Sequence, residues 1–440
     1  MKIDLSRPEL AINGGKPVRV KPWLDNFTTG EEEKQAVIKV MDTGYLSLFE
    51  GAHNTDPPFS FWGGPFVQKL EKDWCNYYNV KHAVSMNSAT SGLYASIGSL
   101  GIGYGDEVIT SPFTMSACAA GILVYGAIPI FADVQLETGC LNPKSIEANI
   151  TQRTKAILVV HQFGIPADMD SIMELASKHN LKVIEDCAQA HGAKYKGRYV
   201  GTIGDVGVFS LNVNKTIQSG EGAICTTNDD NIKYRLALIR NHGEAVVEAA
   251  GIKDITNMVG FNYRLSELHA AIAIEQLKKL DHLNSTRIEF VKYLSNEMSK
   301  YECFIPLDRC VHNKFEDCSI NNNFCKPTFY VFAARYIENK SGIKREVLIE
   351  AINSEGIKFY QGYTKPLYLQ PIYQKKSAFK HGYPFSAPEN KESIPNYSLG
   401  ACPNAEKLHY DEIITNEHIR LPNKIEDIED IVRAIDKVLK

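Results

Sequence analysis

The sequence predicts an α/β fold built on a mostly parallel sheet, and three patterns support this prediction. Between residues 80 and 230, short apolar runs with strand character alternate with segments of helical length, as in parallel-sheet proteins. From about Arg264, apolar residues recur every three or four positions through LSELHAAIAIEQLKKLDHL, which is typical of a long amphipathic helix. The last part of the chain mixes a strand with helices. We therefore expect an α/β domain followed by a smaller α+β domain.

The expected strands of the first domain read HAVSM, EVITS, IPIFADV, AILVVHQFG, KVIEDC, VGVFSL and AICTT. The second domain offers one clear strand, TFYVFAARYI, and two helices, KREVLIEAINSEG and IEDIEDIVRAIDKVLK, after an irregular loop around FEDCSINNNFC. A chain of 440 residues is too long for one small core. We predict a large cofactor-binding domain at residues 1–284, including the N-terminal segment, and a small domain at 285–440.

Composition narrows the class of protein. The chain is 44% hydrophobic and 23% charged with a formal net charge of -4, so neither nucleic acid nor an anionic membrane is an expected partner. No apolar run reaches the roughly 18 residues of a membrane helix, and the start MKIDLSRPEL lacks the apolar stretch of a signal peptide. We predict a cytoplasmic protein.

Ten cysteines without an export signal are expected to be reduced thiols. Four of them, Cys303, Cys310, Cys318 and Cys325, lie close in sequence with His312 among them, so a metal site has to be weighed. Their spacings are wider than those of the cysteine pairs that usually bind zinc. We predict scattered thiols and no metal.

Polar residues follow several of the expected strands. In parallel sheets ligands bind outside the carboxyl ends of the strands. Asn87 to Thr90 follow HAVSM, His161 follows AILVV, Asp186 ends KVIED, and Ser210 to Lys215 follow VGVF. The sequence therefore predicts that chemistry gathers at one rim of the sheet.

Three of these features have both an ordinary and a functional interpretation. Ser88, Thr90 and Ser91 precede a good helix and suit either an ordinary helix cap or a phosphate site. Asp186 ends an apolar strand and needs a cationic or hydrogen-bonding partner, either an arginine, a helix N-terminus or a protonated heterocycle nitrogen. Lys215 stands in a polar loop, where most lysines are simply solvated.

Together the three features match the needs of pyridoxal 5'-phosphate. A cradle holds the phosphate, a carboxylate keeps the pyridine nitrogen protonated, and a lysine forms the Schiff base. Their order along the chain, cradle, Asp186 and then Lys215, also fits. We therefore predict that this cofactor binds here.

Five segments of the chain resemble a known family. The segments GIGYGDEVITSPFTMSACAAGILVYGAIPIFADV, IEDCAQAHGAKYKGRYVGTIGDVGVFSLNVNKTIQSGEGAICTTND, RNHGE, GFNYRLSELHAAIAIEQL and ACPNAEKL resemble the DegT/DnrJ/EryC1/StrS family of sugar aminotransferases. The resemblance extends from about residue 30 to the C-terminus. It implies the fold type I architecture of pyridoxal phosphate enzymes. It also implies transfer of an amino group from glutamate or glutamine to a keto sugar, preferably nucleotide-linked, or to a keto-cyclitol.

The resemblance also implies roles for individual residues. Lys215 would be the Schiff-base lysine and proton shuttle, and Asp186 would pair with the pyridine nitrogen. Gln189 would contact the side of the ring that carries the 3-hydroxyl group. The phosphate would be held by Ser210 together with Ser88, Ala89 and Thr90.

Asn262, in GFNYRL, would reach the phosphate of the neighbouring subunit's cofactor, which implies a homodimer with shared active sites. A turn or helix-capping role for Asn262 remains open.

One position departs from the family pattern. The residue after the threonine of a Thr-aromatic motif usually stacks on the cofactor ring, but here Thr114 is followed by Met115. Methionine is polarizable but lacks a planar face, so either Met115 substitutes or Phe113 moves in, and we favour Met115. We interpret His161 as a core histidine rather than a catalytic acid.

Substrate contacts are expected from QGYTKPLYLQPIY, where the family brings a loop of the small domain toward the substrate. Tyr363, Lys365 and Tyr368 are the candidates. The aromatic segment FSFWGG, residues 59–64, could line the same opening or simply form an interface core.

Three other functions were weighed. A sugar dehydratase of the family would carry histidine in place of Lys215. A regulatory protein without turnover would have lost the lysine or the aspartate, and both are present. A lyase or desulfurase acting on an amino acid would want an arginine clamp, for which Arg264 is a candidate, and a desulfurase also a loop cysteine.

Overall fold

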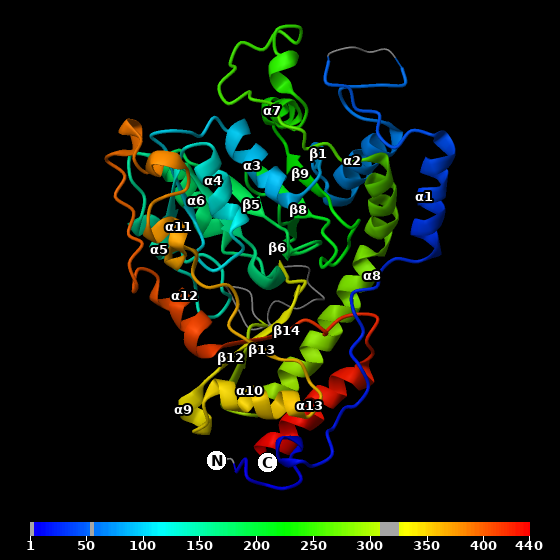
Figure 1. Cartoon of the computed structure of the whole chain (residues 1–440), viewed down its shortest axis with the longest axis vertical. Coiled ribbons are helices and arrows are strands. Elements are labelled where there is room, and N and C mark those ends of the chain that lie inside the picture. The colour runs from blue at the N-terminus through cyan, green and yellow to red at the C-terminus, as the bar shows by residue number, and fades with distance from the viewer. Residues whose placement is uncertain (1–3, 53–56, 309–324) are drawn as a thin grey trace.

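The computed structural model describes residues 4–52, 57–308 and 325–440 (Figure 1). Its centre is a seven-stranded sheet with the order β1-β9-β8-β5-β4-β2-β3. From β8 through β3 all neighbouring strands are parallel, whereas β9 runs antiparallel to both β8 and β1. The strands are β1 (His82–Met86), β2 (Glu107–Thr110), β3 (Ile128–Phe131), β4 (Thr154–Val160), β5 (Lys182–Asp186), β8 (Val206–Ser210) and β9 (Ala223–Thr227).

Both faces of this sheet are covered, which explains why its strands are continuous apolar runs. Along β4, Ile157 and Val159 join one hydrophobic cluster, whereas Ala156, Leu158 and Val160 join another, because successive side chains point to opposite faces. The first cluster includes residues of α2 (Pro65–Tyr78), α5 (Pro143–Ala148), α6 (Met169–His179) and α8 (Glu267–Met298). The second includes residues of α3 (Ala89–Ser99), α4 (Ala117–Val124) and α7 (Asp230–Arg240).

A second, antiparallel sheet lies below the first in Figure 1, with the order β10-β12-β14-β13. Its strands are β10 (Phe304–Pro306), β12 (Phe332–Tyr336), β13 (Tyr360–Gln361) and β14 (Ile413–Asn416), and a small sheet of order β11-β6-β7 joins β11 (Cys325–Lys326), β6 (Lys194–Tyr195) and β7 (Arg198–Tyr199). The remaining helices are α1 (Glu31–Thr43), α9 (Glu338–Ser341), α10 (Arg345–Ser354), α11 (Pro371–Gln374), α12 (Pro403–Lys407) and α13 (Ile425–Leu439).

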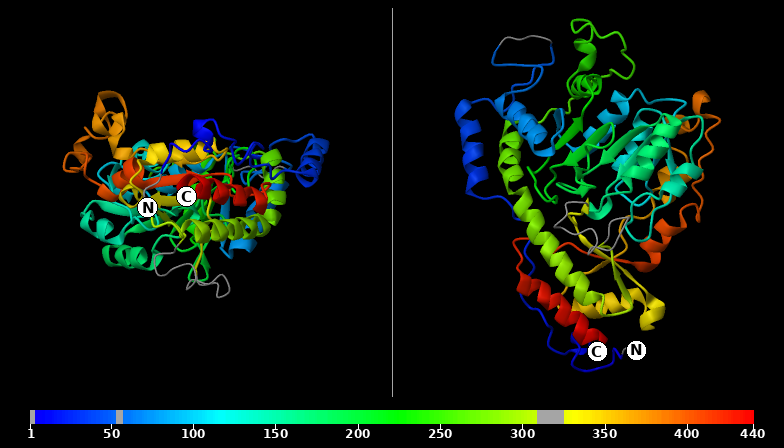
Figure 2. Two further views of the ribbon diagram at one scale, coloured as in Figure 1. Left: turned by 90° about the horizontal axis from the view of Figure 1, so that it is seen from below. Right: turned by 180° about the vertical axis from the view of Figure 1, so that it is seen from behind.

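Helix α8 runs past both sheets as one 32-residue element (Figures 1 and 2). Its first half packs in the cluster of the parallel sheet through Ala270 and Leu277, and its second half in the C-terminal cluster through Val291 and Leu294. The helix is continuous through residue 284, where we placed the boundary between domains, and that boundary stays a prediction.

The N-terminal segment packs against the C-terminal part of the chain. Arg19 forms ion pairs with Asp427 and Asp430 of α13, and the Trp23 indole N–H donates to the Gly356 carbonyl. The marks for the two ends of the chain lie side by side, at the lower end of the molecule in Figure 1 and in the right view of Figure 2. The first residues of the chain therefore complete the C-terminal core rather than that of the parallel sheet.

The structure confirms the predicted α/β class with its mostly parallel sheet. Each of the seven apolar runs contains a strand, and the long amphipathic pattern is helix α8. Among the described residues, we find no helix with both the length and the apolar character needed to span a bilayer.

Candidate active site

A cavity of about 610 Å³ opens at the carboxyl ends of the parallel strands, against loops from the C-terminal sheet. Two sets of residues enclose it. The sheet wall, contributed by the strand ends and the helices that follow them, consists of Ser88, Ala89, Thr90, Leu93, Tyr94, Met115, Ser116, Ala117, Ala120, Asp186, Ala188, Ser210, Asn212, Asn214, Lys215 and Glu221. The C-terminal wall consists of Tyr330, Val331, Tyr363, Thr415 and Glu417.

The N-terminus of α3 forms one end of the sheet wall. Ser88 caps this helix, because its hydroxyl oxygen accepts a hydrogen bond from the Ser91 amide at 3.1 Å. The amides of Ala89 and Thr90 have no acceptor within the helix, and both residues line the cavity. Together with the Thr90 hydroxyl they form a site suited to an anion such as a phosphate.

Asp186 ends β5 and is 6% exposed. Its Oδ1 accepts a hydrogen bond from the Ala188 amide at 2.9 Å, and its Oδ2 accepts one from the Cys118 thiol at 3.1 Å. Burial and the neighbouring Asp186 carboxylate raise the pKa of Cys118 well above its usual range, so this thiol stays protonated and remains a donor. The carboxylate is thus held in one orientation at the edge of the cavity.

The loop after β8 fixes the position of Lys215. Leu211 and Gly222 join its two ends through a backbone hydrogen bond of 2.8 Å, and the Lys215 amide donates to the Asn212 carbonyl at 2.9 Å. The Lys215 carbonyl accepts from the side-chain amide of Asn26, at 2.8 Å, in the N-terminal segment. The lysine backbone is therefore held from both sides.

The next residue gives the loop a second anchor from outside, after Asn26. Thr216 accepts a hydrogen bond from the buried Arg287 guanidinium of α8 at 2.7 Å. This anchor ties the lysine loop to the helix that runs past both sheets.

The amine of Lys215 lies in a mixed environment. Burial lowers its pKa, while the carboxylates of Asp186 and Glu417 oppose this shift. Its Nζ also lies 4.6 Å from the centre of the Tyr330 ring, which is a favourable place for a cation. An amine with a lowered pKa gives up its proton more easily, as a nucleophile or a proton carrier must.

Buried groups behind the sheet wall are structural. Both ring nitrogens of His161 are bonded, since Nε2 lies 3.0 Å from Glu185 and Nδ1 accepts from the Ala167 amide. Glu185 also accepts hydrogen bonds from the amides of the loop Gly201 to Gly204, so although burial alone would raise its pKa, these bonds and His161 lower it. His161, Glu185 and Cys187 are close enough together to hold a metal ion, but the oxygens of Glu185 are already engaged.

His191 was not singled out from the sequence, although it lies in the quoted motif around Asp186. Its ring is 1% exposed and packs against Trp74 and Phe209. Burial and the positive charge of Lys215 lower its pKa to about 3. The imidazole is therefore neutral at physiological pH.

Met115 and Phe113 occupy different places. Met115 lines the cavity and is 54% exposed, whereas Phe113 is fully buried against Phe163 and Tyr363. Of the two candidates for stacking on a ring in the cavity, only Met115 reaches it.

Several predicted site residues lie outside the cavity lining. Gln189 lies behind Tyr363, because its Nε2 donates to the Tyr363 hydroxyl at 2.8 Å and its Oε1 accepts from the Phe163 amide. Asn262 is exposed, and its side-chain oxygen accepts from Arg264. Their expected contacts with a cofactor stay predictions.

The structure brings only one of the three proposed substrate residues to the cavity. Tyr363 lines it, whereas Tyr368 is fully buried with its hydroxyl bonded to Glu406. Lys365 is exposed away from the lining, near His409. Tyr330 and Glu417 also line the cavity but carry no signal in the sequence, since Tyr330 is one of several aromatics in the expected strand TFYVFAARYI and Glu417 belongs to none of the motifs quoted above.

The remaining sequence candidates lie elsewhere. In residues 59–64, Phe61 is buried and Trp62 packs on Tyr234 and under the Lys233 amine. Cys303 and Cys325 are buried in different hydrophobic clusters, and Cys310, His312 and Cys318 lie outside the described residues.

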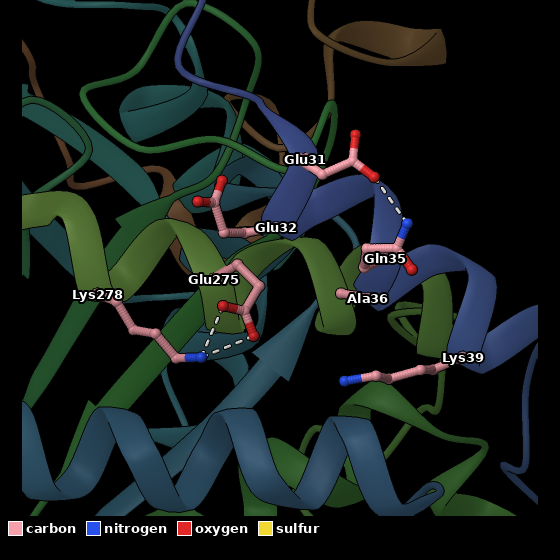
Figure 3. Close-up of a pocket in the computed structure, with 7 residues that line it drawn as sticks. All are labelled: Glu31, Glu32, Gln35, Ala36, Lys39, Glu275 and Lys278. Atoms are coloured by element: carbon pink, nitrogen blue, oxygen red, sulfur yellow. Dashed lines mark hydrogen bonds and ion pairs between the residues drawn. The ribbon is translucent and has the colours of Figure 1, made fainter.

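A second hollow, between α1 and α8, shows what a pocket without this chemistry looks like (Figure 3). It is lined mainly by charged side chains that bond to each other on the surface. Glu275 pairs with Lys278, and Gln35 donates to Glu31. No buried carboxylate or buried amine lines it.

Comparison with known proteins decides the family. The model of the DegT/DnrJ/EryC1/StrS aminotransferase family matches residues 58–424. The chain belongs to this family. The resemblance identified from the sequence is thereby confirmed, and the chain is a pyridoxal phosphate-dependent aminotransferase of fold type I.

Among curated proteins, the enzyme is 30% identical over 442 residues to the L-glutamine:2-deoxy-scyllo-inosose aminotransferase of Streptoalloteichus tenebrarius, covering 98% of this chain and 97% of the relative. It is also 30% identical over 416 residues to the spore coat polysaccharide biosynthesis protein SpsC of Bacillus subtilis, covering 92% and 96%.

Among solved structures, an aminotransferase from Psychrobacter cryohalolentis is 28% identical with a TM-score of 0.77, covering 95% of this chain and 98% of that one. The Helicobacter pylori aminotransferase PseC, at 24% identity and a TM-score of 0.74 with 95% and 99% covered, shares the fold.

Proposed function

We propose that this aminotransferase moves an amino group from glutamine or glutamate to the ketone of a keto sugar or keto-cyclitol, in the biosynthesis of an amino sugar or aminocyclitol. The observation that carries this proposal is the meeting of Asp186, Lys215 and the N-terminus of α3 around one cavity. The names of the relatives support the donor and the acceptor, since one curated relative is a glutamine-dependent aminotransferase of a keto-cyclitol.

The residues of the sheet wall fit pyridoxal 5'-phosphate. The free amides at the start of α3, with the hydroxyls of Ser88, Thr90 and Ser210, suit its phosphate. Asp186, held by Ala188 and Cys118, suits a protonated pyridine nitrogen. Met115 lines the cavity and would offer a polarizable side chain to the ring. When bound, the cofactor supplies an electron sink for the carbon that exchanges its proton.

Lys215 is the residue that we assign to proton transfer. Burial lowers the pKa of its amine, and the loop anchors at Asn26 and Thr216 fix its backbone. The Nζ atom takes a proton from the carbon of the donor and returns one to the carbon of the acceptor. Asp186, held by the Ala188 amide and the Cys118 thiol, would face the nitrogen of the cofactor ring.

We also infer that the enzyme is a homodimer with shared active sites. Asn262 is exposed and accepts a hydrogen bond from the half-buried Arg264, so its side chain would be available to a second subunit. Sedimentation velocity of the purified protein tests whether it is a dimer. The cofactor affinity of an Asn262→Ala variant, compared with that of the wild type, separately tests whether the site is shared. A cytoplasmic location stays a prediction.

The test of the function is a spectrum of the purified enzyme with pyridoxal 5'-phosphate, recorded before and after addition of glutamine or glutamate. We expect a visible band that one donor discharges, and we expect no such band in the Lys215→Ala variant. Lys144→Ala, an exposed lysine in α5, is the matched control and should behave like the wild type. A band that neither donor discharges would contradict aminotransfer. It would favour a lyase or a regulatory protein without turnover instead.

Two alternatives are less well supported. A dehydratase of this family has histidine at the lysine position, and the cavity of this protein contains Lys215. A regulatory protein without turnover would not need the buried carboxylate of Asp186 and the half-buried amine of Lys215 together.

A further inference from the structure

Helix α4 presents one side to the cavity and another side to Asp186. Ala117 and Ala120 line the cavity, whereas Cys118, which lies between them in the sequence, is fully buried. The Cys118 thiol donates a hydrogen bond to Oδ2 of Asp186 at 3.1 Å. This short helix therefore contributes both to the surface of the cavity and to the support of the carboxylate at its edge.

The two oxygens of Asp186 have separate donors. The Ala188 amide, in the backbone that follows β5, donates to Oδ1 at 2.9 Å. The donor to Oδ2 is Cys118, which comes from a different element 68 positions earlier in the chain. With the Ala188 bond alone, the carboxyl group could still rotate about the bond to its β-carbon, because this torsion has broad minima. The second donor fixes the plane of the carboxylate and the directions of its remaining lone pairs.

The surroundings of the thiol suit it to this task. Cys118 belongs to the same apolar cluster as Ile122 and Leu158, and the Thr114 side chain hydrogen-bonds its sulfur. A thiol is a weak donor, but water does not compete for its bond in a buried place, where hydrogen bonds are electrostatically stronger. Because its side chain is fully buried, Cys118 acts on Asp186 and does not touch the contents of the cavity.

The partner that we assign to Asp186 depends on direction. A hydrogen bond weakens steeply when donor and acceptor are misaligned, and a charge-assisted bond between a protonated ring nitrogen and a carboxylate is worth more than a neutral one. A carboxylate that rotates freely loses part of this bond, because its lone pairs face the nitrogen for only part of the time. A second donor on Asp186 therefore matters for the strength of cofactor binding.

We propose that Cys118 is a positioning residue, whose thiol aims the Asp186 carboxylate at the ring nitrogen of the cofactor. This inference rests on the proposed aminotransferase function and adds to it a residue that was not among the candidates from the sequence. Cys118 acts through Asp186, so its removal should weaken the bond to the ring nitrogen and leave the contacts with the phosphate unchanged.

The test compares two ligands that differ only at the ring nitrogen. Pyridoxal 5'-phosphate has this nitrogen, and 1-deazapyridoxal 5'-phosphate has carbon in its place. Fluorescence titration of the cofactor-free protein gives both dissociation constants, and their ratio reports the bond to Asp186 because the contacts common to both ligands cancel. A wild type that binds neither ligand contradicts the proposed function. A wild type that binds both equally well supports a cofactor site but overturns the role of Asp186 at the nitrogen, and with it that of Cys118.

Variants at Cys118 test its role directly. Cys118→Ala removes the donor, so the preference for the ligand with the ring nitrogen should fall by about fivefold. Cys118→Val fills the space without a donor and should show the same fall, whereas Cys118→Ser keeps a donor and should stay within about twofold of the wild type. Cys225→Ala, at another fully buried cysteine of the same cluster, is the matched control and should keep the wild-type ratio.

A purely structural Cys118 would give a different result. Its loss would weaken the binding of both ligands by the same factor and leave their ratio unchanged, and this result overturns the proposal. A Cys118→Ser variant with as large a fall as Cys118→Ala overturns it as well. The NMR signal of cofactor labelled at the ring nitrogen provides a second measurement: it should indicate a protonated nitrogen in the wild type and in Cys118→Ser, and shift toward the unprotonated form in Cys118→Val.

Discussion

The two walls of the cavity are built in different ways. On the sheet wall, Asp186 and Lys215 are fixed by short backbone and side-chain hydrogen bonds close to the ends of β5 and β8. On the C-terminal wall, Tyr330, Tyr363 and Glu417 come from segments that approach the cavity only because the antiparallel sheet packs beside the parallel one. The difference suggests that the sheet wall carries the reacting groups and that the C-terminal wall contacts the substrate.

The largest effect should follow from damage to the sheet wall at Asp186. Asp186→Asn keeps the size of the side chain but removes the charge that a protonated ring nitrogen needs, so kcat should fall by at least about 100-fold. Steady-state kinetics with saturating cofactor measure this loss. Asp42→Asn, an exposed aspartate of α1, should retain full activity. If kcat of the Asp186 variant falls by less than tenfold, the carboxylate has a structural role only.

The core behind the sheet wall should respond to acid through His191. Its pKa is about 3 in the folded protein and about 6.5 in an unfolded chain, so the unfolded state binds the proton first. The stability associated with the neutral ring is present above pH 6.5 and is lost as the pH falls toward 3. Between pH 7 and pH 5 this amounts to about 2 kcal/mol.

Urea unfolding of the cofactor-free protein at the two pH values measures this loss. His191→Phe, which retains the aromatic packing against Trp74 and Phe209, should lose about 2 kcal/mol less than the wild type over the same interval. His179→Gln, an exposed histidine, should lose as much as the wild type. Equal losses in all three proteins would show that His191 is not protected from protonation.

The smallest effect should come from the C-terminal wall at Tyr330. Removing the ring beneath the Lys215 amine in Tyr330→Ala should lower kcat/KM by about tenfold, the equivalent of about 1.4 kcal/mol for a partly desolvated cation above a ring. Tyr330→Phe keeps the ring and should remain within about threefold of the wild type. If the two substitutions are equally damaging, the phenol hydroxyl and not the ring is what matters.

Most of the sheet wall could be predicted from the sequence. Asp186 and Lys215 are near the ends of apolar runs, and ligands gather at the carboxyl ends of parallel strands, so the strand pattern alone is enough to bring these two residues together. Ser88 could be predicted from a different local signal, since a hydroxylated residue before a helix indicates a cap. Local sequence is sufficient to place a functional residue when that residue follows its strand within a few positions.

The C-terminal wall could not be predicted in the same way. Tyr368 looked equivalent to Tyr363 in the sequence, but its hydroxyl bonds to Glu406, which is 38 positions away, and this contact keeps it in the core. Glu417 reaches the cavity because β14 is an inner strand between β12 and β13, and nothing in its neighbourhood in the sequence indicates this pairing. Tertiary packing over long separations decided both outcomes.

The N-terminal segment also connects two parts of the molecule that are far apart in the sequence. Arg19 is bonded to Asp427, 408 positions later in the chain, and Asn26, a few residues beyond, holds the carbonyl of Lys215. This short segment thus contacts both α13 and the lysine loop, so the position of the Lys215 backbone is tied to packing at the far end of the molecule.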